Sequence, residues 1–145
     1  MSLIRVLTVD DFEPCRDIVR SILAASTDVE VIGEACDGPE AIQKAEQFRP
    51  EVILLDITLP GLNGIQIARE LRKRVPECKI LFFSQHDSPS LVRAALNTGA
   101  HGYVLKREAA LELVPAVEAI ASNRHFISRS LTGSGLSETT HPPAL

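Results

Sequence analysis

Five short apolar segments alternate with five amphipathic patterns along this chain, and that alternation strongly constrains its fold. Three of the segments are almost continuously apolar: Ile4–Val9, Val52–Leu55 and Lys79–Phe83. Strands have this composition when helices cover both faces of a parallel sheet. Two further strands are expected at Val29–Ala35 and Gly102–Leu105.

The segments between these strands have helical spacing and helical boundaries. In the first of them, apolar residues recur at i, i+3, i+4, i+7 and i+8, at Cys15, Ile18, Val19, Ile22 and Leu23. Proline at the start of a helix costs no hydrogen bond, so Pro14, Pro39 and Pro89 mark three helix starts. Pro115 would disturb a helix interior, and the fifth helix is therefore predicted to begin only at 111–113.

Strict alternation of strand and helix implies right-handed crossovers and one parallel sheet between two helical layers. The sequence therefore predicts a doubly wound α/β domain over residues 4–127. Residues 128–145 are rich in Ser, Thr, Gly and Pro and show no periodicity. We expect them to form a flexible C-terminal tail.

Composition excludes several classes of protein. The 145 residues carry 15 basic and 19 acidic side chains, a net charge of -4, which argues against a strongly basic nucleic-acid binder. A membrane-spanning helix needs about 20 apolar residues, which no segment offers. Cys15, Cys36 and Cys78 are widely spaced and odd in number, which indicates reduced thiols in a cytoplasmic protein.

Polar residues follow four of the five predicted strands. They are Asp10 and Asp11 after the first, Asp56 after the third, Ser84 after the fourth and Lys106 after the fifth. A single Asp at a strand end is usually a turn residue or a helix cap. In a parallel sheet, however, these ends meet at the edge where ligands bind, so we expect the five side chains to converge.

The charges of this cluster predict a divalent cation. Three carboxylates and one ammonium sum to -2, an arrangement that repels itself unless a cation joins it. Oxygen ligands favour Mg²⁺, which keeps several of its waters. Phosphoryl transfer needs mainly alignment and neutralised charge, and Asp56 could act as a nucleophile that forms an aspartyl phosphate.

The same residues resemble a known family. Val9-Asp10-Asp11, the segment 55–61, the strand that ends at Ser84 and the segment 102–106 look like the receiver domain of two-component response regulators. The resemblance covers about 120 residues in the correct order and implies a flavodoxin-like (βα)5 sheet with strand order 2-1-3-4-5. The segment 99–106 is most similar to the LuxR/NarL-type subfamily.

The resemblance implies a role for each matching residue. Asp56 would accept a phosphoryl group from a histidine kinase or phosphotransfer protein. Asp11, Asp56 and the backbone carbonyl of Thr58 would hold Mg²⁺, and Asp10 would act on it mainly through water. The domain would catalyse only its own phosphorylation and dephosphorylation.

Three further residues are expected to act after phosphorylation. Ser84 would turn its hydroxyl onto a phosphoryl oxygen, Lys106 would pair with another, and Tyr103 would swing inward. The face formed by the fourth helix, fifth strand and fifth helix would then change and bind a downstream protein. Homodimerisation on phosphorylation is left open, and so is a role of Thr58 and His86 in hydrolysis of the aspartyl phosphate.

Two features depart from what is usual among receivers, and one rival function stays open. Arg107 stands where many receivers have Pro, and the 17 residues after Ser128 are too few for a helix-turn-helix, which favours a stand-alone receiver without direct nucleic-acid binding. A phosphatase that forms an aspartyl phosphate would need a general acid where Thr58 stands, so we discount that function. A nucleotide- or flavin-binding domain is discounted because neither a dinucleotide-binding motif nor a P-loop motif occurs. A phosphorylation-independent, receiver-like interaction module remains the alternative.

Overall fold

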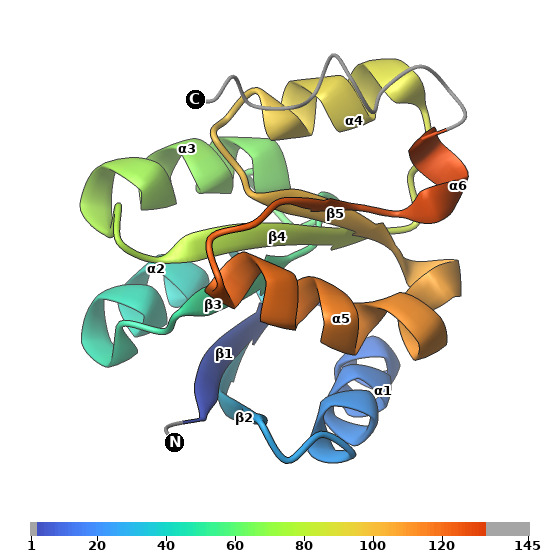
Figure 1. The fold of residues 1–145 in the computed structure, drawn as a ribbon. Coiled ribbons are helices and arrows are strands. Elements are labelled where there is room, and N and C mark those ends of the chain that lie inside the picture. Colours follow the sequence, from blue (N-terminus) through green and yellow to red (C-terminus); the bar gives the residue numbers. More distant parts are fainter. Residues whose placement is uncertain (1–2, 133–145) are drawn as a thin grey trace.

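A computed structural model describes residues 3–132 of the chain, in which six parallel strands form one sheet. The strand order is β2-β1-β3-β4-β5-β6 (Figure 1). The strands are β1 (Ile4–Val9), β2 (Val29–Ala35), β3 (Val52–Leu55), β4 (Lys79–Ser84), β5 (Gly102–Leu105) and β6 (Phe126–Ile127). The predicted order of the first five strands is confirmed, and β6 extends the sheet beyond β5.

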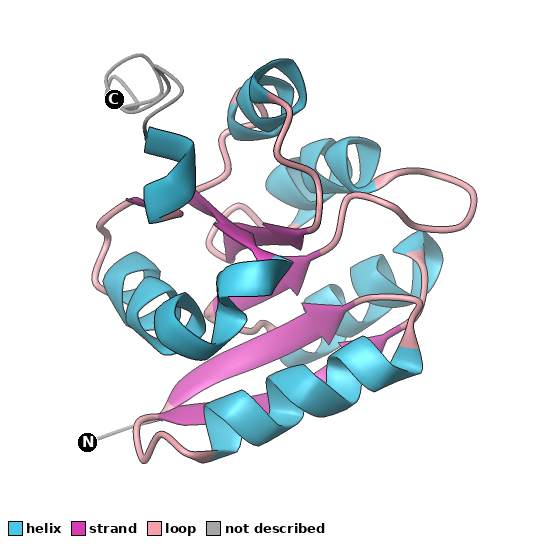
Figure 2. Cartoon of the chain, turned by 90° about the vertical axis from the view of Figure 1, so that its right-hand side faces the viewer, coloured by secondary structure: helices cyan, strands magenta, loops and turns pink. Residues whose placement is uncertain are grey.

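Helices cover both faces of this sheet, as the apolar strands require (Figure 2). The helices are α1 (Glu13–Ala24), α2 (Gly38–Phe48), α3 (Gly64–Arg74), α4 (Pro89–Leu96), α5 (Ala109–Ala121) and the short α6 (Arg129–Leu131), with a 3₁₀ turn at Lys106–Glu108. One core packs α1 and α5 against the sheet, and the other packs α2, α3 and α4. Among the described residues, no helix is long and apolar enough to cross a membrane.

The central strands are buried on both faces, which explains their apolar composition. All four residues of β3 are at most 1% exposed, and five of the six residues of β4 are buried. Fully burying one Leu or Ile side chain stabilises a fold by about 1.5–3 kcal/mol. These strands therefore form a rigid support for the polar residues at their carboxyl ends.

Helix α5 begins earlier than the sequence predicts. It starts at Ala109, directly after the 3₁₀ turn, and Pro115 lies inside it. Pro115 is on the exposed side of the helix, and so is Leu111, whose carbonyl the missing N–H would have bonded. Since water can reach that carbonyl, the helix tolerates the proline, and the predicted start at 111–113 is wrong.

The predicted limit of the domain at residue 127 falls short of the packed structure. Ser128 is fully buried, and its N–H donates to the Tyr103 carbonyl at 2.9 Å. Leu131 in α6 is 2% exposed and packs into the core. The domain therefore extends into α6, and the rest of the predicted tail, residues 133–145, lies outside the described residues.

Candidate functional site

Parallel register brings four strand ends to one edge of the sheet. Val9 of β1 pairs with Leu55 of β3, so the residues that follow them, Asp10 and Asp56, are neighbours. On the other side of β3, Ser84 pairs with Leu105, the residue before Lys106. All five strand-end side chains predicted to converge are therefore near this edge.

Asp10, Asp11 and Asp56 form an acidic cluster at this edge. One carboxylate oxygen from each residue lies within 4.8 Å of the others. Asp10 and Asp56 are only 5% and 6% exposed, whereas Asp11 is open to solvent. Two of the three charges are thus largely shielded from water, and their mutual repulsion is correspondingly strong.

Lys106 lies against the two buried carboxylates. Its Nζ donates to Asp10 Oδ2 at 2.8 Å and to Asp56 Oδ2 at 3.0 Å. Burial disfavours the ammonium, but the hydrogen bonds and the attraction of both carboxylates outweigh it and raise the pKa of Lys106. Lys106 therefore stays charged and fixes these two oxygens.

The Asp56 carboxylate keeps an unfavourable environment despite this contact. Burial raises its pKa, and the nearby Lys106 offsets only part of that effect, while the charge of Asp10 adds to it. With Asp11 included, three carboxylates face one ammonium, a formal sum of -2. A further cation at this position would relieve the repulsion.

The donor set fits a hard divalent cation. The available ligand atoms are carboxylate oxygens, which Mg²⁺ prefers, and exposed Asp11 leaves room for bound water. Lys106 engages one oxygen of Asp10 and one of Asp56, so the second oxygen of each carboxylate is not used by this contact. The cluster can therefore accept Mg²⁺ without losing Lys106.

A second group of polar contacts is centred on His86, in the loop between β4 and α4. Its N–H donates to Ser84 Oγ at 3.1 Å, and its carbonyl accepts from Tyr103 Oη at 2.7 Å. Its ring Nε2 lies 2.8 Å from Thr58 Oγ1. His86 thus connects three residues that the sequence singles out, and this connection was not predicted.

Tyr103 is fully buried, and its hydroxyl points toward the His86 loop. Burial raises the pKa of its phenol to about 12, so the group remains a donor at neutral pH. The sequence predicts that this side chain swings inward on activation. In this structure it already lies inside, so no outward starting position is seen.

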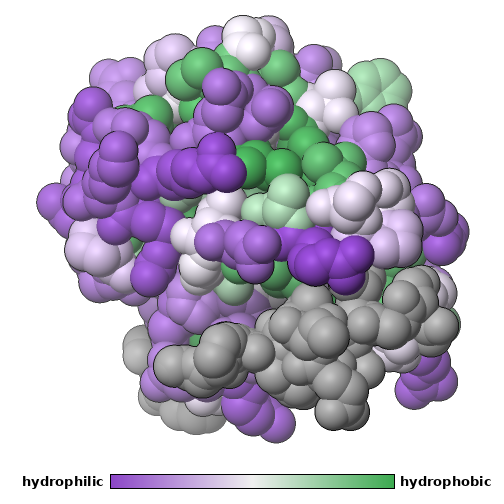
Figure 3. Space-filling view, turned by 90° about the horizontal axis from the view of Figure 1, so that it is seen from above, coloured by the Kyte–Doolittle hydropathy of each residue, from purple (hydrophilic) through white to green (hydrophobic). Residues whose placement is uncertain are grey.

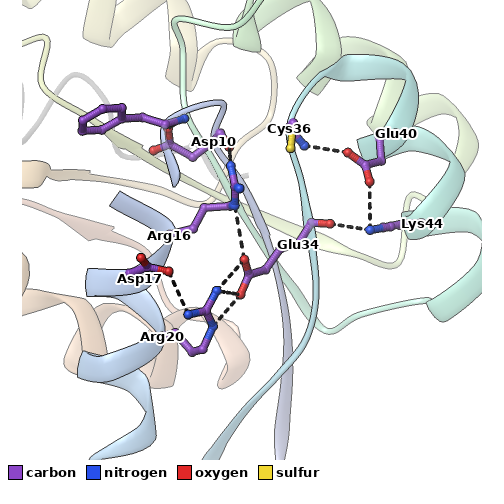
Figure 4. A network of polar contacts seen from close by, with 9 residues as sticks. Asp10, Arg16, Asp17, Arg20, Glu34, Cys36, Glu40 and Lys44 are labelled. Atoms are coloured by element: carbon purple, nitrogen blue, oxygen red, sulfur yellow. Dashed lines mark hydrogen bonds and ion pairs between the residues drawn. The ribbon is translucent and has the colours of Figure 1, made fainter. Parts of the chain in front are cut away.

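Arg16 is a site residue that the sequence analysis missed. Its Nη1 donates to the Asp10 carbonyl at 2.6 Å, and its Nε donates to Glu34 Oε1 at 3.2 Å (Figure 4). One signal was available: Arg16 lies three residues before Val19 and therefore next to the buried face of its helix. A charge at such a position requires a partner.

The fold and the site together define a class of protein, a doubly wound domain with an acidic cluster and a lysine at the carboxyl ends of its strands. The sequence profile of the family described as "Response regulator receiver domain" matches residues 6–118. The chain belongs to this family. It is a receiver domain of two-component signalling, as the resemblance indicates.

Individual relatives agree with this assignment. The transcriptional regulatory protein DegU of Brevibacillus brevis is 37% identical over 135 residues, which cover 93% of this chain and 57% of DegU. LiaR of Bacillus subtilis is 32% identical over 139 residues, or 96% of this chain and 66% of LiaR. The chain thus spans about three-fifths of the length of these relatives.

A solved structure agrees as well. The crystal structure of a LuxR-family response regulator from Aurantimonas sp. SI85-9A1 superposes with a TM-score of 0.89 at 31% identity. The match covers 97% of this chain and all of that one. The predicted similarity to the LuxR/NarL-type subfamily is therefore confirmed. Residues 3–132 correspond to the receiver part of the regulators in this subfamily.

Proposed function

We propose that Asp56 is the phosphoacceptor of this receiver and takes its phosphoryl group from a histidine kinase or a phosphotransfer protein. One observation carries the proposal: the Asp56 carboxylate is buried beside Asp10 and 3.0 Å from Lys106, at the edge where the strands end. This arrangement supplies a fixed nucleophile and fixed charges, which are the main requirements of phosphoryl transfer.

In the proposed reaction, a carboxylate oxygen of Asp56 attacks the phosphorus of the donor. The new O–P bond forms as the bond from phosphorus to the donor's imidazole nitrogen breaks, and the imidazole leaves with that electron pair. Lys106 then shifts from the Asp56 carboxylate toward a phosphoryl oxygen while its contact with Asp10 holds it in place. Bound Mg²⁺ would neutralise charge on the phosphoryl oxygens.

In the proposed site, three carboxylates and one backbone carbonyl surround the metal position. Asp11, Asp56 and the backbone carbonyl of Thr58 would hold Mg²⁺, and Asp10 would act on it mainly through water. The closeness of the three carboxylates supports this assignment. The same residues would orient the water that later hydrolyses the aspartyl phosphate. Thr58 and His86, whose side chains contact each other at 2.8 Å, would modulate that step.

Phosphorylation would be transmitted through Ser84 and Tyr103. Ser84 Oγ accepts a hydrogen bond from His86, so its own hydroxyl proton can be given to a phosphoryl oxygen. A shift of the His86 loop would move the acceptor of Tyr103 and hence the α4-β5-α5 face. Leu91, Ala94 and Leu96 of α4 are partly buried and pack against the core. The side of the molecule seen from above shows apolar residues among polar ones (Figure 3).

The signalling context follows from this proposal. The chain would act in the cytoplasm, where histidine kinases present their phosphohistidine, and its output would be a downstream protein. Direct nucleic-acid binding is not part of the proposal because the net charge is -4. Homodimerisation on phosphorylation is compatible with it.

One observation favours the alternative, a phosphorylation-independent interaction module. Tyr103 is already inside and bonded to the His86 carbonyl, the position expected only after phosphorylation. A receiver held in this arrangement could bind its partner without phosphate. Both functions use the same face, so the chemistry at Asp56 distinguishes them.

The test is the mass of the intact protein after incubation with acetyl phosphate and Mg²⁺. We expect a gain of one phosphoryl group that disappears with EDTA and in Asp56→Asn. Asp28→Asn, at an exposed carboxylate before β2, is the matched control and should still gain phosphate.

A gain that persists in Asp56→Asn would contradict the assignment of the acceptor. No gain in the native protein, together with absence of beryllofluoride binding, would reject the phosphoacceptor and leave the interaction module. Circular dichroism of both variants checks that the fold is retained.

A further inference from the structure

Arg16 connects the acidic loop to the rest of the domain by polar contacts. It lies in the first turns of α1, and its side chain is only 13% exposed. The guanidinium reaches the Asp10 carbonyl with one nitrogen, at 2.6 Å, and Glu34 at the end of β2 with another, at 3.2 Å (Figure 4). A charged donor to a carbonyl is among the stronger hydrogen bonds of a protein.

Glu34 is itself held firmly, so it is a fixed anchor for Arg16. Arg20 donates to both of its carboxylate oxygens, each at 2.8 Å. The backbone carbonyl of Glu34 accepts from Lys44 Nζ at 2.5 Å, and Lys44 in turn pairs with Glu40 in α2. The position of Arg16 is thereby tied to α1, β2 and α2.

The carbonyl that Arg16 holds belongs to the peptide unit between Asp10 and Asp11. The Asp10 carboxylate has other restraints, the N–H of Phe12 at 2.9 Å and Lys106 at 2.8 Å. The exposed Asp11 carboxylate makes no hydrogen bond within residues 3–132, so its position depends on the backbone. Arg16, Thr8 and Asp10 also line a small cavity of about 10 Å³.

We infer that Arg16 is a positioning residue for the divalent cation site, because it fixes the peptide that places Asp11 against Asp10 and Asp56. The inference rests on the metal-binding part of the proposed function. Arg16 does not touch the metal ligands' carboxylates, and it acts through the backbone and through its anchor Glu34.

The sign of the effect separates positioning from simple electrostatics. Arg16 is a cation beside a cluster of carboxylates, so Coulomb repulsion alone predicts tighter Mg²⁺ binding when it is removed. Positioning predicts weaker binding. Loss of a residue that orients metal ligands typically lowers metal affinity by about 10- to 100-fold, and we expect about tenfold for Arg16→Ala.

The experiment measures cation binding directly, without phosphorylation. Mn²⁺ is titrated into the protein, the free ion is followed by electron paramagnetic resonance, and Mg²⁺ is then added as competitor. Arg16→Ala and Arg16→Lys are compared with Arg74→Ala, which removes an exposed arginine paired with Glu70 and Glu46 on the other side of the sheet. Thermal unfolding monitors the stability of each variant.

We expect Arg16→Ala to bind Mn²⁺ and Mg²⁺ more weakly than the native protein. Arg16→Lys should lose less affinity, and Arg74→Ala should keep the native affinity. Glu34→Gln should also weaken binding, and the combined variant should lose no more than Arg16→Ala, because Glu34 acts through Arg16. Raised Mg²⁺ should restore the phosphorylation rate of Arg16→Lys, a change in KM for the metal without a change in kcat.

Unchanged or tighter binding in Arg16→Lys and Glu34→Gln would overturn the inference even if Arg16→Ala fails to fold. If the native protein binds the ion while these variants match it, only the role of Arg16 is rejected. If the native protein itself binds neither Mn²⁺ nor Mg²⁺, the proposed metal site fails, and the inference with it.

Discussion

The two buried carboxylates of the acidic site, Asp10 and Asp56, each have hydrogen-bond partners that constrain their positions. Lys106 holds one oxygen of Asp56 and one of Asp10, and the Phe12 N–H holds the second oxygen of Asp10. The two buried carboxylates are therefore fixed before any ligand arrives. Preorganised charges of this kind lower the cost of reorganisation during phosphoryl transfer.

Replacing Lys106 by methionine tests this arrangement. Removing one fixed charge from a reacting site typically lowers the rate by about 10²- to 10³-fold, and we expect about 10² for phosphorylation of Lys106→Met by acetyl phosphate. The variant also leaves Asp10 and Asp56 without their cation. Added Mg²⁺ should therefore raise its melting temperature more than that of the native protein.

The matched control is Lys73→Met, at an exposed lysine of α3. It should keep the native rate and the native response to Mg²⁺. An equal rise in melting temperature for Lys106→Met and the native protein would show that Lys106 does not neutralise the cluster. The measurements are the phosphorylation rate by mass and the melting temperature with and without Mg²⁺.

The strand-end residues could be predicted from the sequence, whereas the contacts of His86 and Arg16 could not. Parallel strands bring their carboxyl ends together whatever the side chains are, so Asp10, Asp56 and Lys106 follow from topology alone. The contact between Thr58 and His86 joins two loops that are 28 residues apart. Its formation depends on loop conformations that no periodicity encodes.

At the scale of elements, the buried hydroxyl of Ser128 attaches the C-terminal segment of the domain to β5 and α5. Ser128 Oγ accepts the N–H of Leu105 at 2.8 Å and donates to Glu112 Oε1 at 2.5 Å. The second carboxylate oxygen of Glu112 accepts the N–H of Arg129 at 3.0 Å. These contacts connect β5, α5 and the start of α6.

Ser128→Ala should therefore destabilise the domain. It leaves a buried backbone N–H without an acceptor and removes a donor from Glu112, and an unsatisfied buried group costs about 1–3 kcal/mol. We expect a loss in this range from urea unfolding. Ser130→Ala, at an exposed serine of α6, is the control and should lose less, although it also contacts a carboxylate, Glu108.

Ordinary surface substitutions change the free energy of unfolding by less than about 0.5 kcal/mol. A loss this small in Ser128→Ala would show that the Ser128 contacts do not stabilise the domain. The same contacts explain why β6 and α6 could not be predicted. A two-residue strand has no period to detect, and polar residues such as Ser128 usually indicate exposed chain. Strands β3, β4 and β5 were predictable because burial on both faces selects apolar residues along them.

At the scale of the whole molecule, the end of the sheet opposite the acidic site contains a partly buried histidine, His101, with specific contacts. His101 precedes β5, stacks on His125 with 5.8 Å between ring centroids, and accepts the Ile80 N–H through Nδ1 at 3.2 Å. Burial, together with the nearby charges of Arg72, His125 and Lys79, lowers the pKa of His101 to about 4. The neutral ring is therefore the form that the fold requires.

Stability should consequently fall as the pH drops between about 6.5 and 4. In this window the unfolded chain binds a proton at residue 101 that the folded chain excludes, which favours unfolding. His101→Asn keeps an acceptor near the Ile80 N–H and cannot take up a proton. The variant should gain stability relative to the native protein on going from pH 7 to pH 4.5, by about 1 kcal/mol after allowance for the partial exposure of the ring.

Urea unfolding of both proteins at the two pH values provides the measurement. The carboxylates that titrate in acid are common to both proteins, so the difference of differences isolates residue 101. A negligible value would mean that the ring is protonated in the folded chain at little cost. A stability gain of about 1 kcal/mol in His101→Asn would assign part of the acid sensitivity of the domain to His101. Because His101 lies at the end of the sheet away from Asp56, fold stability could then be altered there without changing the phosphorylation site.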